Sequence, residues 1–160
     1  MLPTPSRSWR PHAAAALLAL AAGCASSTAP DVAPGAEAGR YVAATANGRA
    51  LPTVVYASPV DTTVLLADTL VLDGRGGAVR STARRYVWRG ATAGIDTVYR
   101  LTWSQAYRVA SGGRIEVGSF TPCPPNANCA ANEVGVVFSD RVELDTVGNR
   151  PRVVLRRAGD

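Results

Sequence analysis

Alternation of apolar and polar side chains over residues 99–109 is the feature that most restricts how this chain folds. One parity holds aromatic and aliphatic residues with a single Gln, and the other holds polar or charged residues with a single Ala. Successive side chains of a β-strand point to opposite faces, so the pattern predicts one face in a core and one in water. We therefore expect Trp103 to point inward. We expect Arg100, Thr102 and Arg108 to point outward, because a register slipped by one residue would bury two Arg side chains.

Similar short patterns, separated by turn signals, continue along the chain. Predicted strands cover residues 41–46, 51–57, 62–66, 68–73, 79–89, 95–109, 114–120, 133–138, 141–145 and 152–156. The segments 62–66 and 68–73 form either one bent strand or two. Asn47 and Gly48 predict a type I′ hairpin turn, which needs a positive φ at both central positions.

The strand pattern predicts an all-β fold class. After the N-terminal apolar run, no segment shows sustained helical periodicity. Many short strands joined by tight turns are typical of a small antiparallel up-and-down barrel of about eight strands or of a sandwich, and successive hairpins favour the barrel. A change of apolar parity near Arg84 and Arg85 predicts a β-bulge there, of the kind that bends barrel strands.

Two short phrases resemble the small lipocalin-like domains of uncharacterised bacterial lipoproteins. The first is ANGRALP at 46–52, after the opening strand, and the second is VVLRR at 153–157. The resemblance implies a lipocalin-like barrel over residues 41–157. It transfers no binding or catalytic residue.

The N-terminus has the features of an export signal. Arg7 and Arg10 precede an apolar run at 13–22, which is shorter than the roughly 20 residues that span a bilayer. The segment LAAGC, ending at Cys24, resembles the lipobox of bacterial lipoproteins. That resemblance implies cleavage before Cys24, a diacylglyceryl group on its thiol and a fatty acid such as palmitate on its amine. An ordinary secretory signal with a chance Cys is the alternative.

These features divide the chain into three parts. Residues 1–23 are the expected signal peptide, residues 24–40 a flexible lipid-anchored linker rich in Ala, Pro, Gly and Ser, and residues 41–160 the barrel domain. The lipobox resemblance implies a location in the cell envelope. Because Ala25 rather than Asp follows the Cys, it implies an outer-membrane anchor with the domain facing the periplasm.

Cys123 and Cys129 are expected to form a disulfide. They lie in the phrase CPPNANC, and an exported protein folds in an oxidising compartment. A zinc site is the alternative, but such sites usually recruit four Cys or His ligands. The one His of the chain, His12, lies in the expected signal peptide, so we expect neither a metal nor another cofactor.

Composition argues against an enzyme and against nucleic-acid binding. Without a His after cleavage, Ser–His–Asp and Cys–His catalysis are excluded. Glu143 and Asp145 share one face of a strand, but that face is the wet one, where carboxylates make poor general acids. The net charge of +5 comes partly from the expected signal peptide. This surplus is too small to indicate a nucleic-acid partner.

The remaining candidate site is an aromatic wall that would hold a small apolar ligand inside the barrel. Its residues are Tyr86, Trp88, Tyr99, Trp103 and Tyr107. The structural alternative is that these rings fill the core, because an eight-stranded barrel has room for little else. We thus expect a lipid-anchored envelope domain of binding or structural type. The second interpretation is a protein-binding inhibitor or envelope adaptor that acts through loops such as 121–132.

Overall fold

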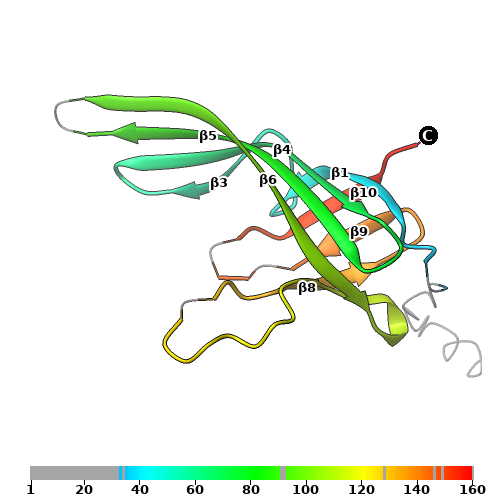
Figure 1. The fold of residues 1–160 in the computed structure, drawn as a ribbon. Coiled ribbons are helices and arrows are strands. Elements are labelled where there is room, and N and C mark those ends of the chain that lie inside the picture. Colours follow the sequence, from blue (N-terminus) through cyan, green and yellow to red (C-terminus); the bar gives the residue numbers. More distant parts are fainter. Residues whose placement is uncertain are drawn as a thin grey trace, which may run out of the picture.

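Eight antiparallel strands close into a barrel in the described part of the computed structural model, which comprises residues 33, 35–90, 93–127, 129–145, 147–148 and 150–159 (Figure 1). The barrel strands are β1 (Gly39–Ala46), β4 (Asp61–Leu72), β5 (Gly77–Arg89), β6 (Gly94–Val109), β7 (Arg114–Gly118), β8 (Glu133–Val137), β9 (Arg141–Leu144) and β10 (Val153–Arg157). From β4 to β10 each strand pairs with the next, and β1 closes the ring by pairing with both β10 and β4. The predicted up-and-down barrel is confirmed.

Two further strands lie outside the ring. β2 (Arg49–Ala50) pairs with β1, and β3 (Thr53–Ala57) pairs with β4. Asn47 and Gly48 have φ values of 50° and 75°, which confirms the predicted hairpin turn between β1 and β2. A 3₁₀ turn at Ser111–Gly113 joins β6 to β7.

The N-terminal predictions lie mostly outside the described residues, including the signal peptide, Cys24 and most of the linker. The packed chain starts at Glu37 rather than at Tyr41. The Tyr41 hydroxyl donates a hydrogen bond of 2.7 Å to the Glu37 carbonyl, and the Tyr107 hydroxyl donates one of 3.1 Å to the Glu37 carboxylate. Burial, together with this carboxylate, raises the pKa of Tyr107 to about 12. The last residues of the predicted linker therefore belong to the barrel.

The predicted bulge at Arg84 and Arg85 is wrong, because the bulge lies on the neighbouring strand. β5 pairs with β6 in unbroken register, whereas the pairing of β4 with β5 shifts between Leu65 and Ala67. Residues 62–66 and 68–73 are accordingly one bent strand. The apparent change of parity in β5 arises because a charged residue, Arg80, occupies an inward position.

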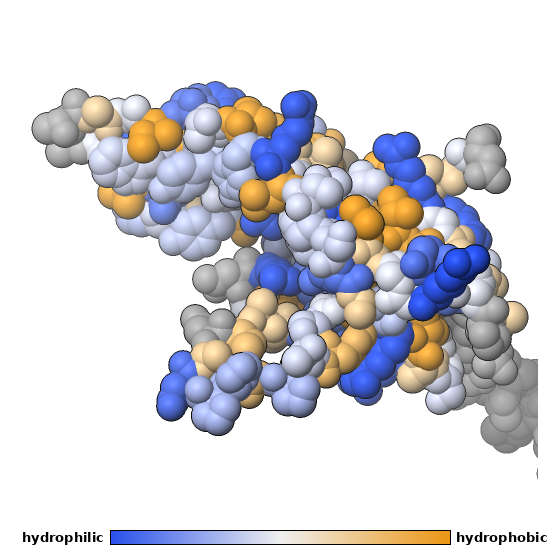
Figure 2. Space-filling model, viewed as in Figure 1, coloured by the Kyte–Doolittle hydropathy of each residue, from blue (hydrophilic) through white to orange (hydrophobic). Residues whose placement is uncertain are grey.

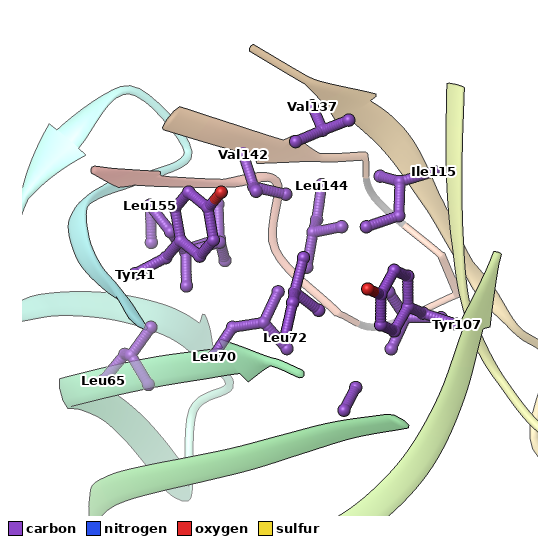
Figure 3. Close-up of a cluster of buried hydrophobic side chains, with 14 residues drawn as sticks. Tyr41, Leu65, Leu70, Leu72, Tyr107, Ile115, Val137, Val142, Leu144 and Leu155 are labelled. Carbon is purple, nitrogen blue, oxygen red and sulfur yellow. The ribbon is translucent and has the colours of Figure 1, made fainter. Parts of the chain in front are cut away.

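Apolar side chains fill the barrel interior (Figure 3). The fully or nearly fully buried ones are Tyr41, Ala46, Leu65, Leu70, Leu72, Ala78, Tyr107, Ile115, Val117, Val137, Val142, Leu144, Val153 and Leu155. Every strand of the ring contributes to them, although β5 contributes only Ala78. Along each strand they alternate with residues that are more exposed, as expected when one face of a strand is buried. The barrel is thus a packed core and not a ligand-sized cavity.

Three barrel strands are much longer than the others. β4, β5 and β6 have 12, 13 and 16 residues, whereas β7 to β10 have four or five. With β3, their excess length forms a four-stranded sheet that extends beyond the ring, at the upper left of Figure 1. We call residues 53–66, 84–89 and 94–101 the projecting sheet. The chain enters the barrel at the other end, where Gly39 pairs with Leu72.

Leu70 and Val71 provide a matched test of the core. Leu70 is 0% exposed and Val71 is 39% exposed on the same strand. Leu70→Ala is expected to lower the free energy of unfolding by about 2–5 kcal/mol, because it leaves a cavity in a packed core. Val71→Ala should lower it by about 0.5 kcal/mol or less. Urea denaturation measures both changes, and equal losses would contradict the placement of Leu70.

Candidate functional site

A cluster of charged side chains lies at the end of the barrel core nearest the projecting sheet. Arg80 on β5 donates hydrogen bonds of 2.9 and 2.5 Å to the two carboxylate oxygens of Asp68 on β4. It also pairs with Glu133 on β8, which in turn pairs with Arg150. Arg80, Asp68 and Glu133 are only 5%, 1% and 3% exposed. The cluster therefore joins two neighbouring strands to a third strand farther round the ring.

Arg80 remains charged despite its burial. Burial alone would lower the pKa of Arg80, but hydrogen bonds and charges from Asp68 and Glu133 outweigh it and raise the pKa. Removing charges from water costs several kcal/mol each, so such a group persists only when every charge is paired. The sequence analysis missed this cluster. A charge at an inward position of three separate predicted strands was the available signal.

A cavity of about 200 Å³ lies beside the charged cluster. Its lining combines charged and apolar side chains: Leu65, Asp68, Arg80, Arg84, Leu101, Trp103, Glu133, Arg150 and Pro151. Nε of Arg84 is buried and has no hydrogen-bond partner among the described residues. Arg84 also has no ion-pair partner among the described residues. The cavity is thus a small space lined by three Arg, two acidic and four apolar side chains.

The residues of the predicted aromatic wall do not lie together inside the barrel. Only Tyr107 belongs to the core, where its hydroxyl bonds to Glu37. Trp103 lies opposite Arg80 in the register of β5 and β6. It is half-buried and lines the cavity. The expected facing of β6 is confirmed, since Trp103 shares the inward parity of Tyr107 while Arg100, Thr102 and Arg108 are exposed. Trp103 is nevertheless not part of the closed core.

The other three wall residues lie on the projecting sheet. Tyr99 pairs with Arg84, so it lies on the sheet face that continues the barrel interior, and Tyr86 and Trp88 follow Arg84 at the same parity. We call this the inner face, with Tyr56, Tyr86, Trp88, Ile95, Tyr99 and Leu101. The prediction grouped these aromatic residues correctly but placed them in the wrong part of the fold, because alternation does not show where a long strand leaves the ring.

Exposed apolar side chains concentrate on the projecting sheet. Of the ten large hydrophobic residues that are exposed in the described ranges, six lie on it: Val54, Tyr56, Val60, Ile95, Val98 and Leu101. Figure 2 shows apolar patches on this part of the molecule, and a hollow beneath it. A monomeric soluble domain rarely leaves such a concentration in water, so the projecting sheet is the strongest candidate for an interaction surface.

The loop after β7 lies opposite the inner part of β6. Cys123 and Cys129 are at disulfide distance, with their sulfurs 2.20 Å and their Cα atoms 5.9 Å apart. Residues 118–121, Cys123, Ala127 and residues 129–132 line a wide open groove together with residues 103–106 of β6. The loop thus borders the same side of the molecule as the cavity.

The carboxylates considered for catalysis have structural partners. Glu143 accepts hydrogen bonds from Arg141 and Arg152, and the Arg141 hydrogen bond is the main reason that the pKa of Glu143 is lowered.

Within the described ranges, no group of three or more Cys, His, Asp or Glu residues could hold a metal ion. A search of the same ranges found no helix with the length and hydropathy to cross a membrane.

The charged cluster makes a stability prediction. Arg80→Met is expected to lower the free energy of unfolding by about 3–5 kcal/mol, because Asp68 stays buried without its cation. The control is Arg85→Met, which removes an ion pair to Asp96 whose side chains are about half exposed. That change should leave the free energy of unfolding nearly unchanged, because solvent screens an exposed pair. Denaturation of both variants measures the difference, and a small effect of Arg80→Met would contradict a structural role for the cluster.

No family model, curated protein or solved structure matches this chain. The fold and the residues just described are therefore the basis for any statement about function.

Proposed function

We propose that this chain is a lipid-anchored cell-envelope adaptor that binds a protein partner on the inner face of the projecting sheet. One observation carries the proposal. The barrel interior is filled by its own side chains, while most of the exposed large apolar residues lie on a sheet that extends beyond it. A carrier of a small apolar ligand would show the opposite arrangement, with an enclosed apolar space and a polar exterior.

The charges of the projecting sheet favour a partner segment that is both apolar and acidic. Its cations are Arg84, Arg85, Arg89 and Arg100. Among the described residues only Arg85 has an ion-pair partner, Asp96. The carboxylate of Asp61, the other acidic residue of the sheet, accepts a hydrogen bond from the Ser58 hydroxyl. On the inner face the aromatic rings lie beside Arg84, which has no ion-pair partner among the described residues, while Arg89 and Arg100 lie on the opposite face. This arrangement suits a partner with apolar side chains and a carboxylate.

The position of the projecting sheet also suits an adaptor. The chain enters the barrel at Gly39, which pairs with Leu72 at one end of β4. The other end of β4 belongs to the projecting sheet, on the opposite side of the barrel. An anchor at Cys24 would therefore attach to the end of the barrel away from the sheet. The inner face would then be directed away from the membrane surface.

A second candidate function is the binding of a small amphiphile with an anionic head. The buried Arg84 Nε without a partner, at the cavity beside Trp103, favours it. The cavity of about 200 Å³ admits a head group such as a carboxylate, and the tail would lie along the inner face.

Anchoring is tested with the whole gene expressed in a bacterium. Wild type is expected to fractionate with membranes and to incorporate a labelled fatty acid, and Cys24→Ser to do neither, because stable anchoring needs acyl chains on the Cys. Cys123→Ser serves as the control that loses a thiol but keeps the anchor. Equal fractionation without labelling in wild type and Cys24→Ser would refute the anchor.

Partner binding is tested by photo-crosslinking in cells. A photoreactive phenylalanine analogue replaces Tyr56 on the inner face or, as the matched control, exposed Val79 on the barrel wall. We expect a discrete adduct at position 56 that contains a second polypeptide other than this chain, and none at 79, because only the inner face would be covered. No adduct at 56, or the same adducts at both positions, would contradict the adaptor. A lipid adduct at 56 would favour the second candidate.

A further inference from the structure

The free edge of β6 has a feature that the adaptor proposal does not use. Among the described residues, β7 pairs with β6 only from Ala106 to Val109, although β6 starts at Gly94. The main-chain N–H of Tyr107 is directed to the β5 side, where it bonds to Gly76 at 2.7 Å. Main-chain groups alternate along a strand, and the register with β5 is unbroken, so the odd-numbered residues of β6 bond toward β5.

The even-numbered residues therefore direct their N–H and C=O groups to the open side. They are Asp96, Val98, Arg100, Thr102 and Ser104. Open edges of this length are normally shortened, covered or blocked, because they template pairing with another strand. Val98 lies near the middle of this edge and is 54% exposed, the highest value among the exposed large hydrophobic residues. The edge is available for pairing in its central part.

We propose that two copies of this chain pair through β6 in antiparallel orientation, with Val98 opposite Val98 of the second copy. A two-fold interface presents the same surface on both sides, so the residue numbers of each opposed pair add to one constant. In this register Asp96 lies opposite Arg100 of the second copy, and Arg100 lies opposite Asp96 of the second copy. The overlap covers residues 94–102 in each copy.

Charge selects this register over its neighbours. A two-fold at Arg100 or at Asp96 would put like charges directly opposite each other, which is unfavourable across a strand pair. A two-fold at Tyr99 would leave Asp96 opposite Thr102 and Arg100 opposite Val98, with no ion pair formed. Arg100 has no ion-pair partner among the described residues of its own chain. The Arg85 hydrogen bonds lower the pKa of Asp96, which keeps this carboxylate charged.

The same register covers apolar surface on the inner face. Ile95 comes to lie opposite Leu101 of the second copy, and these residues are exposed in the single chain. Thr97 lies opposite Tyr99 in the same way. The two projecting sheets would form one continuous sheet. Its order would be β3-β4-β5-β6 from one copy followed by β6-β5-β4-β3 from the other. This inference rests on the main-chain edge of β6, whereas Tyr56 lies on β3 at the other edge of the sheet, so the two proposals are tested separately.

The register is tested by disulfide trapping of the purified full chain in mild non-ionic detergent with a soluble oxidant. Antiparallel strand pairs bring opposed Cα atoms within the roughly 4.4–6.8 Å that a disulfide spans. Val98→Cys should therefore form a covalent dimer. The matched control is Val54→Cys, equally exposed on β3 at the other edge of the sheet. Trapping at 98 no greater than at 54 would overturn the proposal.

A charge exchange tests the pairing without a new thiol. Asp96→Arg and Arg100→Asp, each alone, should raise the dimer dissociation constant at least about tenfold, because each variant opposes like charges twice per dimer. The double variant Asp96→Arg with Arg100→Asp should recover most of the loss. Sedimentation over a concentration series measures the constants, and circular dichroism checks the fold. A monomer at all concentrations, or no recovery in the double variant, would overturn the inference.

Discussion

The buried pairing of Arg80 with Asp68 and Glu133 is the contact on which the arrangement of this molecule depends. It joins β4, β5 and β8 at the end of the apolar core nearest the projecting sheet. On one side of it the barrel is filled with Leu, Val, Ile and Tyr side chains, and on the other side lies the small cavity at the base of the projecting sheet. Charged side chains are stable in this buried position because each is paired, whereas an unpaired charge would have to stay in contact with water.

The projecting sheet follows from unequal strand lengths. β5 and β6 pair over the whole length of β5, but β7 offers β6 only four partners and β1 offers β4 only four. The excess length has to pair within itself, and it does so with β3 as a fourth strand. No other described part of the chain forms a second layer on this sheet, so both of its faces have side chains in contact with solvent. Two-layer packing is what normally buries the apolar face of a sheet, and its absence here leaves that face available to another molecule.

The aromatic residues illustrate how such a design separates stability from binding. Tyr107, at the inner end of β6, is buried and bonded to Glu37, and it contributes to the core. Tyr99 and Leu101 occupy the same parity of the same strand but lie beyond the ring, where no strand covers them. Side chains of one pattern thus serve two purposes along one strand. The boundary between them is set by where β7 ends and not by any change in β6 itself.

The sequence by itself determined the strands, most turns, the facing of β6 and the all-β barrel, because period-2 alternation and turn residues such as Asn47 and Gly48 act locally. It also pointed to Cys123 and Cys129, which the structure places at disulfide distance. Only the tertiary structure decided that Arg80 is inward and paired, that the bulge is on β4, and that the predicted wall residues except Tyr107 lie at or beyond the rim of the filled barrel. These features depend on which strand lies beside which and for how long. That information comes from contacts between residues distant in sequence, which alternation within a single strand does not contain.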